Sequence, residues 1–84
     1  GPADLAADMG HMGDLLHADV QHAIMAALKK IAAAGKAPGI LSTHDPMTED
    51  AINAGARFVA VGADSLILSH AAQALAAKWK APKA

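Results

Sequence analysis

The apolar run Phe58–Val61 (FVAV) constrains the fold of this 84-residue chain more than any other feature. A run without a polar side chain that is rich in β-branched residues is typical of a strand covered on both faces, as in a parallel sheet. Gly62 closes the run, and Asp64 or Ser65 can cap a helix directly after it. The segment therefore predicts a strand followed by a helix, the unit from which parallel sheets are built.

A second unit of the same kind precedes this one. The short apolar run Gly39–Ser42 suits a buried strand better than a helix. Asp45 is then predicted as an N-cap with Pro46 at the first helical position, and Gly55 ends this short helix.

The clearest helix is predicted over residues 18–34, and Gly35 is placed to terminate it. Lys29 and Lys30 lie near its end, where cations suit the helix dipole. Its apolar residues recur at helical spacing, so that one face is predicted to be buried. These residues are Val20, Ile24, Leu28 and Ile31.

The opening segment Gly1–Gly10 (GPADLAADMG) is predicted to be a third strand followed by a loop. Pro2 fixes φ and lacks an N–H, which favours an extended, unpaired chain, and glycines mark the loop. Asp4 would then lie at the end of a strand. Asp8 is not expected to share a helical face with Asp4, because Gly and Pro disfavour a continuous helix there.

Two other interpretations of this segment stay open. Asp4 could simply cap a turn or a short helix, as Asp often does at strand-to-helix junctions. Alternatively, Gly1-Pro2 could be the remnant of a cleaved tag.

With the opening strand, the chain has three consecutive βα units, so the fold class is α/β with a parallel sheet and right-handed crossovers. The composition is 54% hydrophobic but only 2% aromatic, and cysteine is absent. A core of this size is marginal, so we expect the chain alone to be poorly folded. A net charge of -1 disfavours nucleic-acid binding, and no apolar run is long enough for a membrane span. We expect a cytoplasmic protein.

Three stretches, taken in order, resemble the HpcH/HpaI family of metal-dependent pyruvate aldolases. They are GPADLAADMG at 1–10, GKAPGIL at 35–41 and FVAVGAD at 58–64. The resemblance implies that residues 1–84 form a single segment, comprising strands six to eight and the following helices of a (β/α)8 TIM barrel. The remaining N-terminal barrel segment would supply the other five units. Ala6 and Ala18 depart from the family pattern, where Ser and Pro are usual.

The same resemblance assigns roles to two residues. Asp4 would bind a divalent metal, Mg²⁺ or Mn²⁺ and possibly Co²⁺, while the N–H groups of Ala3 and Asp4 would hold the carboxylate of pyruvate. No catalytic residue is assigned, because the acid/base residues of the family belong to the missing segments. The lysines agree with a metal-dependent mechanism, since none follows a predicted strand, where a Schiff base would form. These lysines are Lys29, Lys30, Lys36, Lys78, Lys80 and Lys83.

The implied function is that of a lyase, a class II pyruvate aldolase that reversibly joins pyruvate or a related 2-oxo acid to an aldehyde and gives a 4-hydroxy-2-oxo acid. The chain alone would be inactive. The resemblance also implies a homo-oligomer, a hexamer in this family. The alternative is a non-catalytic α/β interaction module. In either case the consecutive residues Leu66, Ile67 and Leu68 point around the last helix, so we expect that helix to dock on a partner.

The five histidines show no spacing typical of a metal site. His17 and His22 are out of register for one helical face, and no His-x₃-His pair occurs. His44 follows the second predicted strand and is expected near the mouth of the barrel. The loop residues Leu15, Leu16 and His17 are expected to shape the aldehyde pocket. The other histidines, His11, His22 and His70, are expected in loops or on solvated faces.

Overall fold

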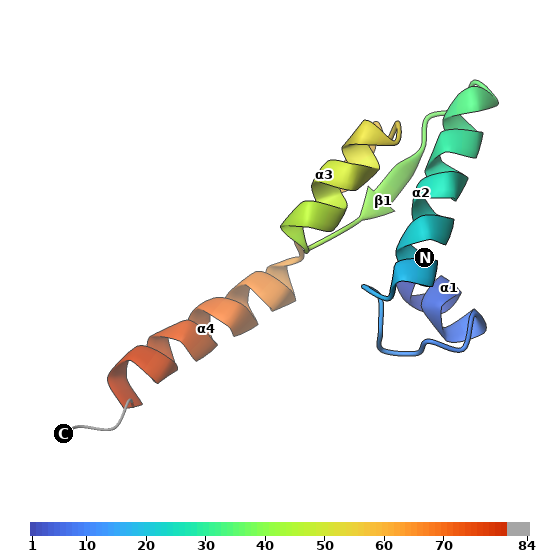
Figure 1. Ribbon diagram of the computed structural model, residues 1–84. Coiled ribbons are helices and arrows are strands. Elements are labelled where there is room, and N and C mark those ends of the chain that lie inside the picture. The colour runs from blue at the N-terminus through green and yellow to red at the C-terminus, as the bar shows by residue number, and fades with distance from the viewer. Residues whose placement is uncertain (81–84) are drawn as a thin grey trace.

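The computed structural model describes residues 1–80, which form an α/β arrangement of four helices and two strands (Figure 1). In chain order these elements are α1 (Pro2–Asp8), α2 (Ala18–Ala33), β1 (Gly39–Leu41), α3 (Asp45–Asn53), β2 (Phe58–Ala60) and α4 (Asp64–Lys80). None of the helices in this range is long and apolar enough to cross a bilayer.

The two strands pair in parallel, as the apolar runs predict. Ile40 lies opposite Val59, and the ladder is extended by a hydrogen bond of 2.9 Å from the Ser42 N–H to the Ala60 carbonyl. Helix α3 connects β1 to β2, so this part of the chain is a complete βαβ unit. Within residues 1–80 no third strand pairs with this sheet, and both of its outer edges stay open.

The core lies where α2 packs on α3 and α1. The predicted face of α2 is confirmed at Val20, Ile24 and Leu28, which are buried at helical spacing, while Ile31 stays exposed. Helix α3 contributes Met47 and Ala51. Four of the eight buried apolar residues are alanines, so the core is well covered but small. Its members are Ala6, Val20, Ile24, Leu28, Met47, Ala51, Ala54 and Ala56.

Both predicted helix terminators are confirmed. Gly35 follows the last residues of α2 with a φ of +79° and donates its N–H to the Ala32 carbonyl at 3.0 Å. The next N–H, of Lys36, reaches the Ile31 carbonyl at 3.2 Å, which completes a Schellman motif. Gly55 ends α3 with the same pair of hydrogen bonds.

The prediction of an opening strand is wrong. Residues Pro2–Asp8 form α1, and Gly1 is its N-cap. The fixed φ of Pro2 suits the first turn of a helix as well as it suits an extended chain, and its missing N–H costs nothing there. The Leu5 N–H donates to the Gly1 carbonyl at 2.9 Å, which closes the first turn. The described residues thus contain two strands instead of the expected three.

The start of α3 also differs by one residue from the prediction. His44, not Asp45, is the N-cap, and its Nδ1 accepts the Met47 N–H at 3.3 Å. Asp45 and Pro46 follow as the first two helical residues, where an acidic side chain suits the helix dipole.

Helix α4 extends away from the other elements (Figure 1). It has no buried residue, although it carries Leu66, Ile67, Leu68, Leu75 and Trp79. The apolar side chains that were expected to dock on a partner are therefore uncovered within the described residues.

Candidate functional site

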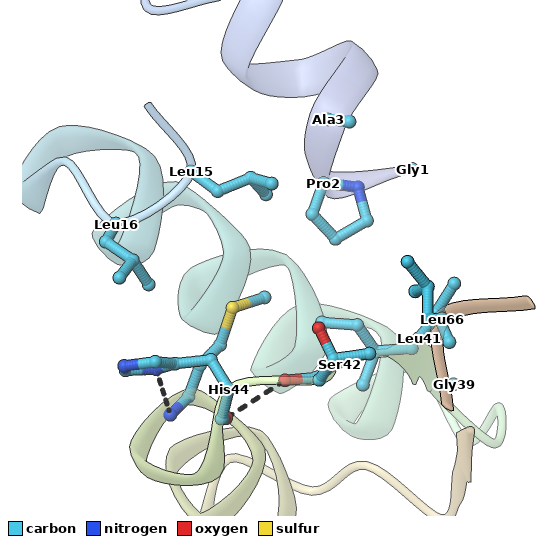
Figure 2. Close-up of a pocket in the computed structure, with 13 residues that line it drawn as sticks. Gly1, Pro2, Ala3, Leu15, Leu16, Gly39, Leu41, Ser42, His44 and Leu66 are labelled. Atoms are coloured by element: carbon cyan, nitrogen blue, oxygen red, sulfur yellow. Dashed lines mark hydrogen bonds between the residues drawn. The ribbon is translucent and has the colours of Figure 1, made fainter. Parts of the chain in front are cut away.

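A cavity of about 500 Å³ lies at the carboxyl end of β1. In parallel α/β folds this end of the sheet is where ligands bind, because the loops that follow the strands gather there. One wall is the first turn of α1, including Ala3, and another is the loop before α2, with Leu15 and Leu16 (Figure 2). Ser42 and His44, which follow β1, form the floor.

The polar groups of the cavity are tied to the start of α3. Ser42 is 4% exposed, and its hydroxyl accepts a hydrogen bond of 2.8 Å from Thr48 Oγ1 and donates to the His44 carbonyl at 3.3 Å. His44 lines the cavity as predicted, but its Nδ1 is occupied as the cap of α3 (Figure 2). These contacts tie the loop after β1 to the first turn of α3.

The rest of the lining is mainly apolar. Leu15 and Leu16 were predicted to shape a pocket and both line the cavity, whereas His17 does not. Met47 and Leu66 contribute from α3 and α4. In the described part of the chain no lysine, arginine or carboxylate lines this cavity. Its walls therefore suit the hydrocarbon part of a ligand.

Asp4 lies in the first turn of α1 and is exposed, next to Ala3, which lines the cavity. Its expected position at the end of a strand is thus corrected to the start of a helix. Asp8 lies one helical turn later on the same face. The expectation that Asp4 and Asp8 do not share a helical face is therefore wrong, because this segment is a helix. Neither belongs to a group of three potential ligands within residues 1–80.

The carboxylate of Asp4 meets only part of what a hard divalent cation needs. A carboxylate oxygen is the ligand that Mg²⁺ and Mn²⁺ prefer, and an exposed side chain can reach an ion. One carboxylate does not complete a coordination shell, so a metal bound to Asp4 would need further ligands.

A second group of ligating side chains lies on the loop between α1 and α2. His11, His17 and Asp19 each offer one ligand atom, and these atoms all lie within 4.8 Å of one another. The two imidazole rings stack with centroids 3.7 Å apart and planes 17° apart. Asp19 Oδ2 lies 3.8 Å from Nε2 of His11 and 3.9 Å from Nδ1 of His17.

The loop that brings these residues together begins with a sharp turn. Gly10 has a φ of +81° and donates to the Ala7 carbonyl at 3.1 Å, while the His11 N–H reaches the Ala6 carbonyl at 2.7 Å. This Schellman motif ends α1 and reverses the chain. At the other end of the loop, His17 is the N-cap of α2, and its Nδ1 accepts the Asp19 N–H at 3.1 Å.

The expectation that the histidines form no cluster is therefore wrong for His11 and His17. Helical spacing was the wrong test, because these two residues face each other across a loop. The signal in the sequence was a His-x-Asp triplet at a helix start, His17 to Asp19, following a loop with glycines at positions 10 and 13. His22 and His70 are exposed, as expected.

Comparison with protein families places this geometry in context. Residues 1–71 match the family model described as HpcH/HpaI aldolase/citrate lyase. The chain belongs to the HpcH/HpaI family.

Two relatives illustrate how far the similarity extends. The chain is 48% identical over 80 residues to the hydroxypyruvate/pyruvate aldolase of Roseobacter denitrificans, a match that covers 95% of this chain and 31% of the relative. It is 51% identical over 83 residues to a 4-hydroxy-2-oxo-heptane-1,7-dioate aldolase of Salmonella paratyphi C, covering 99% of this chain and 32% of that protein. The HpcH/HpaI chain described here thus spans about a third of the length of the curated relatives that it matches.

The lysines of this HpcH/HpaI chain lie where the sequence predicts. Lys29 and Lys30 are on α2, Lys78 and Lys80 are on α4, and none of these side chains follows a strand. Lys36 precedes β1 and is exposed. Lys83 lies outside the described residues.

Proposed function

We propose that this chain is the part of a class II pyruvate aldolase in which β1 and β2 are strands seven and eight of a (β/α)8 barrel. The enzyme would reversibly join pyruvate or a related 2-oxo acid to an aldehyde, with a 4-hydroxy-2-oxo acid as product. The observation that carries the proposal is the cavity at the carboxyl end of β1, in a chain whose residues 1–71 match an aldolase family. The βαβ unit with open sheet edges supports the barrel.

In this proposal Asp4 is a metal ligand, and the Ala3 and Asp4 N–H groups hold the carboxylate of the 2-oxo acid. N–H groups in the first turn of a helix have no carbonyl of their own helix to bind, so they are available as donors. Ala3 lines the cavity, which puts this turn beside the space for a substrate. When bound, Mg²⁺ or Mn²⁺ would polarise the ketone and stabilise the negative charge of the enolate.

The other cavity residues position the aldehyde. Leu15 and Leu16 form an apolar wall opposite the loop after β1, so they would contact the hydrocarbon chain of the acceptor and exclude water from it (Figure 2). The hydrogen bonds among Ser42, His44 and Thr48 hold the floor of the cavity in place. The acid/base residues would come from the missing barrel units.

The proposed partners are the remaining N-terminal barrel segment and further copies of the chain, as a homo-oligomer of the hexameric type that the resemblance implies. The uncovered apolar side chains of α4 support a partner at that helix. A cytoplasmic location stays a prediction from the composition.

The alternative, a non-catalytic α/β interaction module, is favoured by the same helix, since α4 has no buried residue in the described chain. The two proposals differ in what they require of Asp4. Only an aldolase needs its carboxylate.

A chimera tests the aldolase proposal. In it, this chain replaces the matching segment of the Roseobacter denitrificans relative, and the activity with pyruvate and an aldehyde is measured at saturating Mn²⁺. We expect an active chimera, and we expect Asp4→Asn to weaken Mn²⁺ binding by at least about tenfold and to reduce turnover severely, because one metal bond is weakened. Binding of Mn²⁺, measured by calorimetry, gives a readout apart from activity.

Asp8→Asn is the matched control, because it removes a carboxylate from the same face of α1, one turn later. It should keep both activity and Mn²⁺ affinity. Unchanged activity of Asp4→Asn would contradict the metal assignment. A folded chimera without any aldolase activity would favour the interaction module instead.

A further inference from the structure

We propose that His11, His17 and Asp19 form a cation site that binds Zn²⁺. The site lies on the loop between α1 and α2, apart from the cavity at β1, since none of the three residues lines that cavity. It does not depend on the proposed aldolase function or on Asp4.

The distances between the ligand atoms are close to those of a zinc site. Zinc binds histidine nitrogens and carboxylate oxygens at about 2.0–2.2 Å, which places the ligand atoms of a tetrahedral centre roughly 3.4 Å apart. The separations of 3.8 Å and 3.9 Å from Asp19 Oδ2 to the two imidazole nitrogens are therefore too long by only about half an ångström. Asp19 is exposed and has room to close this gap, because its side chain is 70% accessible.

The backbone holds the two histidines together before any ion binds. The Schellman turn at Gly10 fixes His11, and the start of α2 fixes His17 as its N-cap. Between them, the Asp14 N–H donates to the His11 carbonyl at 2.9 Å, and the His17 N–H donates to the Asp14 carbonyl at 3.2 Å. All three ligands thus come from a short, hydrogen-bonded stretch of the chain.

Binding requires one change in the imidazole pair. A metal lies in the plane of an imidazole ring, whereas these rings are stacked 3.7 Å apart with their planes 17° apart. One ring must turn about its χ2 angle, which is a broad and soft torsion for histidine. The ion also competes with the Asp19 N–H for Nδ1 of His17, and the loss of one exposed capping hydrogen bond is small beside the metal–ligand bonds gained.

The donor set selects Zn²⁺ over the cations proposed for Asp4. Two imidazoles and one carboxylate are typical ligands of zinc, with water in the fourth position, while Mg²⁺ prefers oxygen ligands only. The side chains of both histidines are part-exposed, at 28% and 35%, so an ion can enter from solvent.

The test is a zinc titration of the full-length chimera introduced above, near neutral pH and at saturating Mn²⁺, in competition with a chromophoric chelator and with Mg²⁺ in excess. We expect one Zn²⁺ per chain and a rise in helical far-UV circular dichroism, because the ion ties the loop to the first turn of α2. His11→Phe keeps the ring stack without the ligand, and His17→Asn keeps an N-cap residue without the imidazole. Each should weaken zinc binding by at least about tenfold.

His22→Phe is the matched control, an exposed histidine on α2 outside the group, and it should bind zinc as the unchanged chain does. Asp4→Asn should also leave zinc binding unchanged, which separates this site from the proposed Mn²⁺ site. A folded chimera without saturable zinc binding overturns the proposal. So does a His11→Phe variant that binds zinc as tightly as the unchanged chain, or a His22→Phe variant that loses it.

Discussion

Leu16 is the residue through which the cavity is most easily altered. Its side chain lines the cavity, yet it is 51% exposed and does not belong to the buried core. A substitution there changes the chemistry of the cavity wall without leaving a hole in the protein. Because the described lining carries no cation, the wall gives no electrostatic preference for a charged acceptor.

Leu16→Lys in the chimera is predicted to shift acceptor preference toward aldehydes that carry a carboxylate. We expect the ratio of kcat/KM for glyoxylate over butanal to rise by about fivefold, since a partly exposed ion pair contributes up to about 1 kcal/mol. Met12→Lys is the control, because it adds the same charge to the same loop at a side chain that is 83% exposed and does not line the cavity. An equal shift in both variants would show a general charge effect instead.

The candidate site was predictable from the sequence only in part. His44 lies where the order of strand and loop places it, because the residues that follow parallel strands gather at one end of the sheet. Leu15 and Leu16 line the cavity as expected, although the segment before their loop is helix α1 and not a strand. The pairing of His11 with His17 was not predictable from spacing, since it depends on the chain reversal at Gly10. In the proposed aldolase, the other metal ligands would lie on barrel segments outside this sequence.

At the level of elements, helix ends account for most of what the sequence predicted. The C-terminal ends of α2 and α3 follow from glycines in Schellman turns, and the strands follow from short apolar runs bounded by Gly or Pro. The prediction for the opening segment was wrong because proline is compatible with two local structures. It breaks a helix from within but is favoured in the first turn, and only the residues after it decide between these.

Helix α4 is not covered by the rest of the described chain. A substitution at Ile67 tests whether a partner covers it. The Ile67 side chain is 63% exposed on a helix without a buried residue. Ile67→Asp in the chimera is predicted to lower the oligomer mass in light scattering, because a buried charge without a partner opposes association. If a second copy of the chain buries Ile67, that contact explains why α4 carries apolar side chains that the described chain leaves exposed.

Gln73→Asp provides the control for this experiment, since it places the same charge at an exposed polar position of α4. It should leave the mass unchanged. If the Ile67→Asp chimera keeps its full mass as well, α4 packs within its own barrel and the interface role is wrong.

As a whole molecule, the chain is too extended to be an independent globular domain. Its radius of gyration is 16.2 Å, and its principal extents are 58 × 27 × 20 Å. A compact chain of this length would have a radius of gyration of about 12 Å. Much of the difference comes from α4, which extends away from the small core (Figure 1). The described chain leaves apolar side chains exposed and sheet edges unpaired, and a larger assembly is needed to cover them.

The 84-residue chain alone is predicted to be inactive and to unfold without a cooperative transition. Eight mostly small residues form its core, which leaves little free energy to hold a single folded state. Thermal unfolding followed by circular dichroism should give a shallow curve, or the chain should aggregate. A sharp two-state transition of a monomer would instead identify a stable mini-domain.

The open edges of the β1–β2 sheet also have a consequence for folding kinetics. In the proposed barrel β2 is the last strand, so its free edge must pair with the first strand of the same barrel. That pairing joins the segments most distant in the chain, and contacts of high sequence separation form slowly, because a long loop must close before they stabilise anything. The barrel would thus close at the edge of β2. This pairing would form late in folding, after synthesis of nearly the whole polypeptide.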